Sequence, residues 1–355
     1  MRLGVFQGNV GRHFFLSAAL TTAWMASRCR FLPNGTVTMP PLVSVVIPTH
    51  NRAGFLCDCI DSVLANDWPV VEIIVSDDAS DDGTAERVAE RYGGDERIAF
   101  VRSEVSRMAA ATRNAGIPLA KGDYILFLDD DNQADPAMIR RLVEAFRADP
   151  RLGLAGPLSL QLPGKTVFTL GSSYDWLTSQ PRNRFEGKTL DEIAIPDGPC
   201  PTCYSPNAVM FSRAALEAVG GFDPFYGIQY EEADIGYRLL AAGFTAAIVP
   251  EARTLHRLPV ASRESTPLRR LGVTTPRRAY AFARNRPVFV RRFFPWWGQL
   301  SCFLFFIHAA NAYYILLALR HRRADIAWAW FRGALRGLWL AATDSRLCSP
   351  RKVEP

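Results

Sequence analysis

From residue 42 to residue 128, short apolar runs alternate with segments in which apolar residues recur every three or four positions. The runs at 43–47, 71–75, 98–101 and 124–128 are rich in β-branched or aromatic apolar residues, so they predict buried parallel strands. The periodic segments at 53–66, 84–91 and 109–120 predict helices. This alternation predicts an α/β domain with a mostly parallel sheet and helices on both faces.

Polar residues follow three of these runs. They are Thr49-His50-Asn51-Arg52, Asp77-Asp78 and Asp129-Asp130-Asp131. The carboxyl ends of parallel strands meet at one edge of a sheet, where the ligand crevice of such folds opens. We therefore expect one site at this edge.

The three consecutive aspartates repel one another, and a bound Mg²⁺ or Mn²⁺ removes that cost. Alternate residues of an extended segment point the same way, so Asp129 and Asp131 are the expected ligands. The alternative is a solvated acidic turn that caps a helix beginning near Pro136.

After residue 149 the pattern is less regular. Pro, Gly and aromatic residues between 156 and 206 predict long loops and an irregular sheet extension. Helices are expected at 213–219 and 232–242, and a late strand at 245–249.

The apolar run 301–319 is just long enough to span a bilayer, which needs about 20 residues. Both of its flanks are basic, however, whereas a single span normally has asymmetric flanks. The segment 325–342 combines Trp and Leu with Arg332 and Arg336, which is typical of an amphipathic interfacial helix. We expect these helices to lie in the cytosolic leaflet; a helical hairpin packed into a core is the alternative.

Charge and composition support this division. The chain is 48% hydrophobic with a net charge of +6, and many of its arginines lie beyond residue 252. Such a block favours nucleic acid or an anionic membrane, and without a nucleic-acid-binding motif we expect the membrane. The interpretation has three parts: a poorly ordered extension (1–38), an α/β domain that carries the expected site (39–259) and a basic, helical, membrane-associated region (260–355).

Six motifs occur in order: Val45-Val-Ile-Pro-Thr-His-Asn-Arg52, Asp77-Asp-Ala-Ser-Asp-Asp-Gly-Thr84, Arg113-Asn-Ala-Gly116, Phe127-Leu-Asp-Asp-Asp131, Gly220-Gly-Phe-Asp223 and Glu231-Glu-Ala-Asp-Ile-Gly-Tyr-Arg238. Together they resemble the family 2 glycosyltransferases of GT-A fold, a Rossmann-like fold. Tyr280, Arg284 and Asn285 resemble a segment of membrane-associated, bacterial rhamnosyltransferase-like members, and this resemblance implies a contact with pyrophosphate or acceptor. The resemblance covers residues 42 to 259 in its main part.

The resemblance implies an inverting enzyme that moves a sugar from a UDP- or dTDP-sugar to a hydroxyl of a glycan or lipid-linked acceptor. It implies work in cell-surface polysaccharide synthesis at the cytoplasmic face of the inner membrane. Pro48 and Thr49 would shape the base pocket, and Asp78 would accept a hydrogen bond from a pyrimidine N3–H. The remaining donor-binding residues would be Asn51, Arg52, Arg113, Asp129 and Asp130, and the metal ligands Asp129, Asp131 and His256.

Glu231-Glu232 stands where this family usually has Glu-Asp, whose second residue is the general base. Glu232 is therefore the expected base, with Glu231 and Asp234 as supporting candidates. On a helix Glu231 and Asp234 share a face, whereas Glu232 points about 100° away. The alternative is an acidic first turn that stabilises the helix dipole.

Two other functions remain open at this stage. A nucleotidyltransferase of similar fold would need a Gly-rich basic loop after the first strand, where this chain has Pro-Thr-His-Asn-Arg. A catalytically inactive nucleotide-sugar-binding protein would not need the acidic residues at 129, 131 and 232.

Overall fold

The computed structural model describes residues 4–5, 30–31, 37–38, 40–69, 71–257, 268 and 272–349. Most of the segment 1–38, for which we expected a poorly ordered extension, lies outside the described residues.

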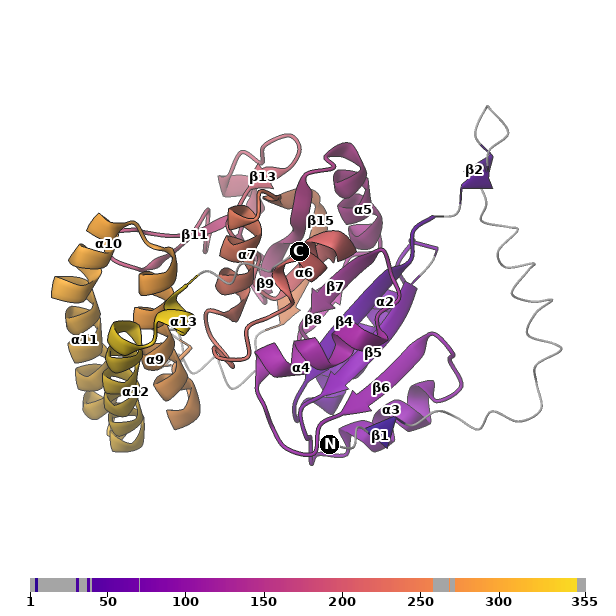
Figure 1. Ribbon diagram of the computed structural model, residues 1–355. Helices are drawn as coiled ribbons and strands as arrows, with labels where there is room; N and C mark the ends of the chain where they lie inside the picture. The colour runs from indigo at the N-terminus through magenta and orange to yellow at the C-terminus, as the bar shows by residue number, and fades with distance from the viewer. Residues whose placement is uncertain are drawn as a thin grey trace.

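The first half of the α/β domain is a parallel α/β unit, as the hydrophobic pattern predicts (Figure 1). Its strands β4 (Val43–Thr49), β5 (Val71–Asp77), β6 (Ile98–Arg102) and β7 (Tyr124–Leu128) are parallel, in the order β6-β5-β4-β7. The connecting helices are α2 (Ala53–Leu64), α3 (Thr84–Tyr92) and α4 (Ala109–Gly116). Branched apolar side chains such as those of Val45 and Ile73 are fully buried, which is why these runs form interior strands.

The second half makes the sheet mixed. Strand β14 (Ala208–Ser212) lies antiparallel between β7 and β9 (Leu152–Leu162), and β15 (Thr245–Arg257) runs parallel to β9. The segment 156–206 therefore begins inside a long strand rather than in a loop. Gly156 interrupts the apolar pattern of β9 because Ser205 and Ile248 leave no room there for a Cβ atom. Short strands complete this region: β8 (Asn132–Ala134), β10 (Thr166–Thr169), β11 (Ser172–Tyr174), β12 (Pro181–Asn183) and β13 (Cys200–Pro201).

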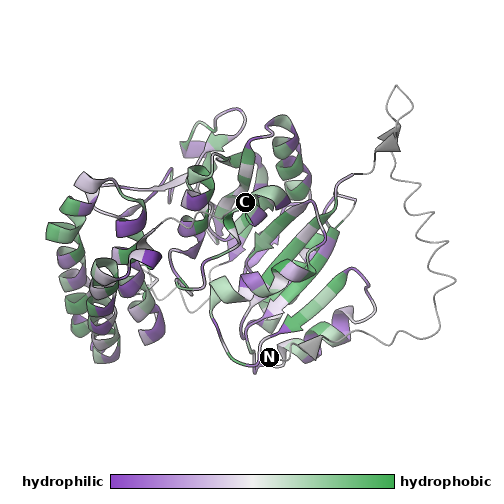
Figure 2. Ribbon diagram, viewed as in Figure 1, coloured by the Kyte–Doolittle hydropathy of each residue, from purple (hydrophilic) through white to green (hydrophobic). Residues whose placement is uncertain are grey.

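Helices cover both faces of the sheet. One buried apolar cluster joins the sheet to α2, α3 and α5 (Met138–Ala148). A second cluster joins the opposite face to α4, α6 (Arg213–Val219) and α7 (Glu231–Ala241). Figure 2 shows the strands as mainly hydrophobic ribbons between these helices. This arrangement leaves the carboxyl edge of the parallel strands as the place where polar side chains gather.

The C-terminal helices form a group at one side of the molecule (Figure 1). They are α9 (Pro276–Phe293), α10 (Trp296–Ser301), a π-helical turn (Cys302–Phe306), α11 (Ile307–Arg320), α12 (Ala324–Thr343) and α13 (Ser345–Cys348). Helix α12 lies so close to α9 that a Cβ atom at Gly337 would be 2.4 Å from the carbonyl oxygen of Arg284. Trp330 is buried in this group, stacked on Tyr314 with 4.1 Å between ring centroids.

Helix α9 is joined to the α/β domain by buried polar contacts. The amide of Asn285 donates to the carbonyl oxygens of Tyr226 and Gln229, each at 2.8 Å. Arg284 donates to the carbonyl oxygens of Phe225 and Tyr226. Arg284 and Asn285, which we expected near pyrophosphate or acceptor, thus bond the backbone that precedes α7.

Candidate active site

The carboxyl ends of β4, β5 and β7 meet the first turn of α7 and the end of β15. The structure therefore brings together nearly all the residues singled out in the sequence. They are Pro48, Thr49, Asn51, Arg52, Asp78, Arg113, Asp129, Asp130, Asp131, Glu231, Glu232 and His256. Asp234 is the exception, as described below.

Arg113 is the centre of this site. Its side chain is 4% exposed and pairs with three carboxylates, those of Asp129 at 2.8 Å and of Glu231 and Glu232 at 3.0 Å. Burial alone would lower the pKa of Arg113, but these carboxylates raise that pKa above its ordinary value. We expected Arg113 to face the base or the phosphates. In this structure it links the aspartate motif after β7 to the start of α7, and its contact with the donor stays a prediction.

Glu232 keeps one carboxylate oxygen engaged and the other available. Its Oε1 accepts from Arg113 and from the backbone N–H of Asn207, at 3.0 and 3.1 Å. Within the described residues, Oε2 has no hydrogen-bond partner. Asn207 has φ 68°, a region that Asn tolerates better than most residues, and its carbonyl oxygen accepts from the N–H of Asp129 at 2.9 Å. The turn at Asn207 thus holds Glu232 beside Asp129.

The two other acidic residues of α7 are placed differently. Glu231 is buried against Arg113, so Glu231 and Glu232 face the same guanidinium from the first turn. Asp234 is fully buried away from it and pairs with Arg238 at 2.7 Å and Arg292 at 2.6 Å. Its carboxylate therefore fixes α7 to α9 and does not face Arg113.

Arg52 pairs with the second and third residues of the aspartate motif, Asp130 at 3.0 Å and Asp131 at 2.8 Å. Asp130 also accepts from the hydroxyl of Thr49 at 2.8 Å, so Thr49 orients a carboxylate of the motif. Burial raises the pKa of Asp130 to about 7, against the opposing effect of Arg52. One guanidinium thus offsets the repulsion between two neighbouring carboxylates.

His256 lies beside Asp131 because of strand register. In the pairing of β15 with β8, His256 is opposite Asn132, the residue after Asp131. Its Nε2 is 3.4 Å from Asp131 Oδ1, while its buried Nδ1 has no partner among the described residues. No cluster of three His, Cys, Asp or Glu side chains suited to a metal occurs in the described part of the chain. A carboxylate and an imidazole nevertheless fit Mg²⁺ or Mn²⁺ when substrate phosphates supply further ligands.

Asp78 organises a loop at the edge of the site. Its carboxylate accepts from the hydroxyl of Ser106 and from the backbone N–H groups of Arg107 and Met108, at 2.6 to 3.0 Å. A carboxylate has about four acceptor positions, so one is left for a base N–H. Next to Asp78, Asn51 (φ 55°) accepts from the N–H of Asp81 at 2.8 Å, and Pro48 is partly buried in β4.

Sequence reasoning missed two residues of this site. Asn207 belongs to it through its backbone conformation, for which Pro206-Asn207 was the available signal. Arg278, on the first turn of α9, lies within electrostatic reach of Asp129, Asp131 and Glu231. Nothing in the sequence separates Arg278 from the arginines around it.

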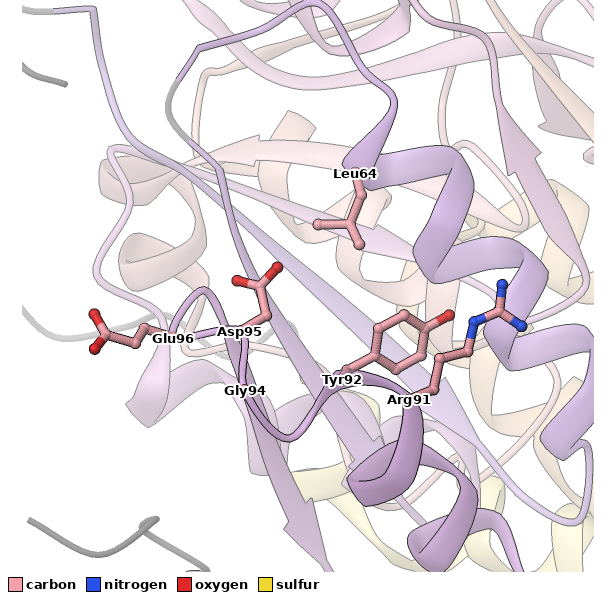
Figure 3. Close-up of a pocket in the computed structure, with 6 residues that line it drawn as sticks. All are labelled: Leu64, Arg91, Tyr92, Gly94, Asp95 and Glu96. Atoms are coloured by element: carbon pink, nitrogen blue, oxygen red, sulfur yellow. The ribbon is translucent and has the colours of Figure 1, made fainter.

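A surface pocket elsewhere has no comparable chemistry. It is lined by Leu64, Arg91, Tyr92, Gly94, Asp95 and Glu96, at the ends of α2 and α3 (Figure 3). These helix ends lead back to the amino ends of the strands, so the pocket lies at the edge opposite the acidic site. Within it, Arg91 and Tyr92 bond Asp61 at the surface.

Comparison with known proteins agrees with this geometry. Residues 44–219 match the profile described as "Glycosyl transferase family 2". The chain belongs to this family. Several of the residues discussed above, from Thr49 to Asn207, fall within the matched segment.

The proteins that this family 2 chain is similar to are named for different activities. It is 25% identical over 231 residues to an N-acetylglucosaminyltransferase of Azorhizobium caulinodans, covering 63% of this chain and 57% of that protein. It is 26% identical over 238 residues to the N-acetylglucosaminyl-diphospho-decaprenol L-rhamnosyltransferase of Mycobacterium tuberculosis, covering 61% and 76%. An uncharacterized glycosyltransferase of Bacillus subtilis, EpsJ, is 39% identical over 107 residues, covering 30% of each chain. The chain spans less than two thirds of the length of several curated relatives.

Two solved structures share the fold of this family 2 chain. GalNAc-T7, crystallised with UDP, GalNAc and Mn²⁺, superposes with a TM-score of 0.54 at 20% identity, over 70% of this chain and 51% of that one. The mannosyltransferase PcManGT of Pyrobaculum calidifontis, in complex with GDP-Man and Mn²⁺, gives 0.50 at 16% identity, over 92% and 94%. The α/β class and GT-A fold implied by the sequence resemblance are confirmed.

Proposed function

We propose that this protein is an inverting glycosyltransferase that moves a sugar from a nucleotide diphosphate to a hydroxyl acceptor. The observation that supports this most strongly is the position of Glu232. Its carboxylate shares Arg113 with Asp129, so a base and the aspartate motif lie at one edge of the sheet. Single displacement needs these two elements next to each other and needs no covalent nucleophile.

The residues of this chain would act as follows. Asp78 and the loop that it holds bind the base, and a carboxylate acceptor suits the N3–H of uracil or thymine. Glu232 Oε2 takes the proton of the acceptor hydroxyl as that oxygen attacks the anomeric carbon. Arg113 and the N–H of Asn207 hold Glu232 in place. The bond from the anomeric carbon to the diphosphate breaks, and the configuration inverts.

Asp131 and His256, with Asp129 nearby, would hold a divalent cation. When bound, Mg²⁺ or Mn²⁺ supplies charge neutralisation to the leaving diphosphate. Mn²⁺ in the two fold neighbours and the carboxylate-plus-imidazole donor set support this assignment.

The screen that tests this function uses the full chain with Mn²⁺ and UDP-, dTDP- or GDP-sugars, with release of nucleoside diphosphate as the signal. We expect release from UDP- or dTDP-sugars. Product analysis with an accepted acceptor should show an inverted anomeric centre. Pyrophosphate release from a nucleoside triphosphate, with none from a nucleotide sugar, would instead establish a nucleotidyltransferase. Nucleotide-sugar binding without turnover in the presence of acceptors would establish an inactive binding protein.

We also propose that the C-terminal helices seat the enzyme on the cytoplasmic face of the membrane, where a lipid-linked glycan is the acceptor. The helix from Trp296 to Arg320 is long and apolar enough to cross a bilayer, and only 22% of its most apolar window is buried. Its outer face and that of α12 expose large apolar side chains: Trp296, Leu304, Phe305, Leu316, Leu319, Trp328 and Trp339. The exposed arginines Arg320, Arg332 and Arg336 suit anionic head groups.

Replacing Phe305 and Leu316, both 65% exposed, with glutamate should weaken binding to phosphatidylglycerol vesicles by at least about tenfold. The reason is that each apolar side chain loses the free energy of burial in the membrane. Vesicle co-sedimentation measures the change. Val105→Glu is the matched control, since Val105 is 61% exposed but lies on the catalytic region. A wild-type chain that stays in the supernatant with these vesicles would contradict the proposed binding to the membrane.

A further inference from the structure

The first turn of α9 lies against the nucleotide side of the site. Thr275 caps this turn by accepting the backbone N–H of Arg278 at 3.2 Å. The guanidinium of Arg277 donates to the hydroxyl and carbonyl oxygens of Ser106 at 3.0 and 3.1 Å, and Ser106 in turn donates to Asp78. The turn that carries Arg278 is therefore held to the loop that borders the proposed base pocket.

Arg278 differs from the other arginines around the site. Arg52, Arg113 and Arg257 each pair with at least one carboxylate. The guanidinium of Arg278 forms no hydrogen bond or ion pair with any residue that the structure describes, although the side chain is partly buried. Burial, reinforced by the positive charge of Arg52, lowers the pKa of Arg278. A partly desolvated cation without a counter-ion is costly, and a bound anion would offset that cost.

The surrounding charges indicate which anion would fit. The carboxylates of Asp129, Asp131 and Glu231 attract Arg278 electrostatically, while Arg52 repels it. An anion bound between Arg278 and those carboxylates would be repelled by the carboxylates. Positive charge from Arg52 and from a metal at Asp131 would offset that repulsion. A diphosphate meets this requirement, and a guanidinium can bind its oxygens in pairs.

We propose that Arg278 binds the diphosphate of the donor and stabilises the charge that develops on it as the sugar leaves. This inference rests on the proposed function. In the transfer, the acceptor oxygen forms a bond to the anomeric carbon and its proton passes to Glu232. The bond from that carbon to the diphosphate oxygen breaks, and its electron pair stays on the diphosphate, which gains one negative charge. A fixed cation next to that oxygen binds the transition state more tightly than the donor.

The experiment compares Arg278→Gln with the wild type. Calorimetry measures the affinity of each protein for uridine, UMP and UDP in the presence of Mn²⁺. We expect the uridine affinity to stay within about twofold, the UMP affinity to fall slightly and the UDP affinity to fall at least about tenfold, as expected for a lost hydrogen bond to a charged group. Arg278→Lys should recover part of the loss, since it restores charge without the paired donors. With UDP-sugar as donor, Arg278→Gln should lower kcat more than it raises KM.

Arg291→Gln is the matched control: the same substitution on the exposed face of the same helix, with its guanidinium bonded to Gln299. It should leave all three affinities unchanged. Equal UDP affinity in Arg278→Gln and the wild type would overturn the inference, as would a loss that is the same for uridine as for UDP. A wild-type chain that binds neither UDP, dTDP nor GDP would contradict the proposed function itself.

Discussion

Replacing Glu232 with glutamine is expected to reduce sugar transfer by at least about a hundredfold while leaving donor binding nearly unchanged. Glutamine keeps the shape of the side chain, and its carbonyl oxygen can still accept from Arg113 and from the N–H of Asn207. The oxygen replaced by the amide NH₂ no longer takes a proton. Transfer rates and calorimetric affinity for the nucleoside diphosphate separate the two effects.

The matched control is Glu231→Gln, which also removes one carboxylate from Arg113 but at a buried oxygen. We expect a smaller loss there, because Glu231 holds Arg113 in place and does not reach the acceptor. A large loss in Glu231→Gln together with normal transfer in Glu232→Gln would move the base to Glu231.

The pH dependence of kcat/KM tests the role of Glu232 independently. Burial raises the pKa of Glu232 to about 8, even though Arg113 opposes the shift. The base must be ionised to accept a proton, so the active form accumulates as the pH rises through this value. Wild-type kcat/KM should therefore fall as the pH is lowered from 9 to 6. A flat profile over this range would mean that Glu232 is already ionised when the acceptor binds.

Replacing Asp131 with asparagine should abolish the strengthening of nucleoside diphosphate binding by Mn²⁺, a loss of at least about tenfold at saturating metal. Asp131 is the carboxylate nearest to His256, and asparagine removes its charge at nearly constant volume. Calorimetry with and without Mn²⁺ measures the difference. In the absence of metal, we expect the mutant to bind the diphosphate at least as well as the wild type, because Arg52 loses one of its two carboxylates.

Asp67→Asn is the control for this experiment, since Asp67 pairs with Arg140 at the surface. It should retain the full effect of Mn²⁺. If Asp131→Asn retains it as well, the metal is held elsewhere.

Hydrophobic pattern and strand-end position predicted much of this molecule. The four parallel strands and their helices followed from β-branched runs and helical periodicity, because both faces of these strands are buried. The same logic placed Thr49, Asp78 and Asp129 at one edge, since the carboxyl ends of parallel strands must meet there. The resemblance of motifs then supplied the family, which the comparison confirms.

What the sequence did not predict depends on long-range geometry. The sequence did not predict strand β9 because Gly156 and Pro157 are typical of loops. The glycine is explained only by the long-range packing of Ser205 and Ile248 against it. Arg113 pairs with Glu231 and Glu232, which lie 118 and 119 positions further along the chain. Arg278 is identified because its guanidinium has no partner among the described residues, whereas Arg52, Arg113 and Arg257 each pair with a carboxylate.

The buried pair between Arg292 and Asp234 has a consequence for protein engineering. Asp234 lies on α7 two residues after Glu232, and Arg292 lies on α9, which packs closely against α12. Losing one partner of an isolated buried ion pair typically costs about 3–5 kcal/mol. Here Arg238 would still face Asp234 and Asp223 would still face Arg292, so we expect the loss to be smaller than that. A chimera that takes its C-terminal helices from another member of the family must therefore take α7 from the same parent, or restore this pair across the junction. Helix α7, with the proposed base Glu232, and the C-terminal helices, which we propose to contact the membrane, can thus be exchanged only as one unit.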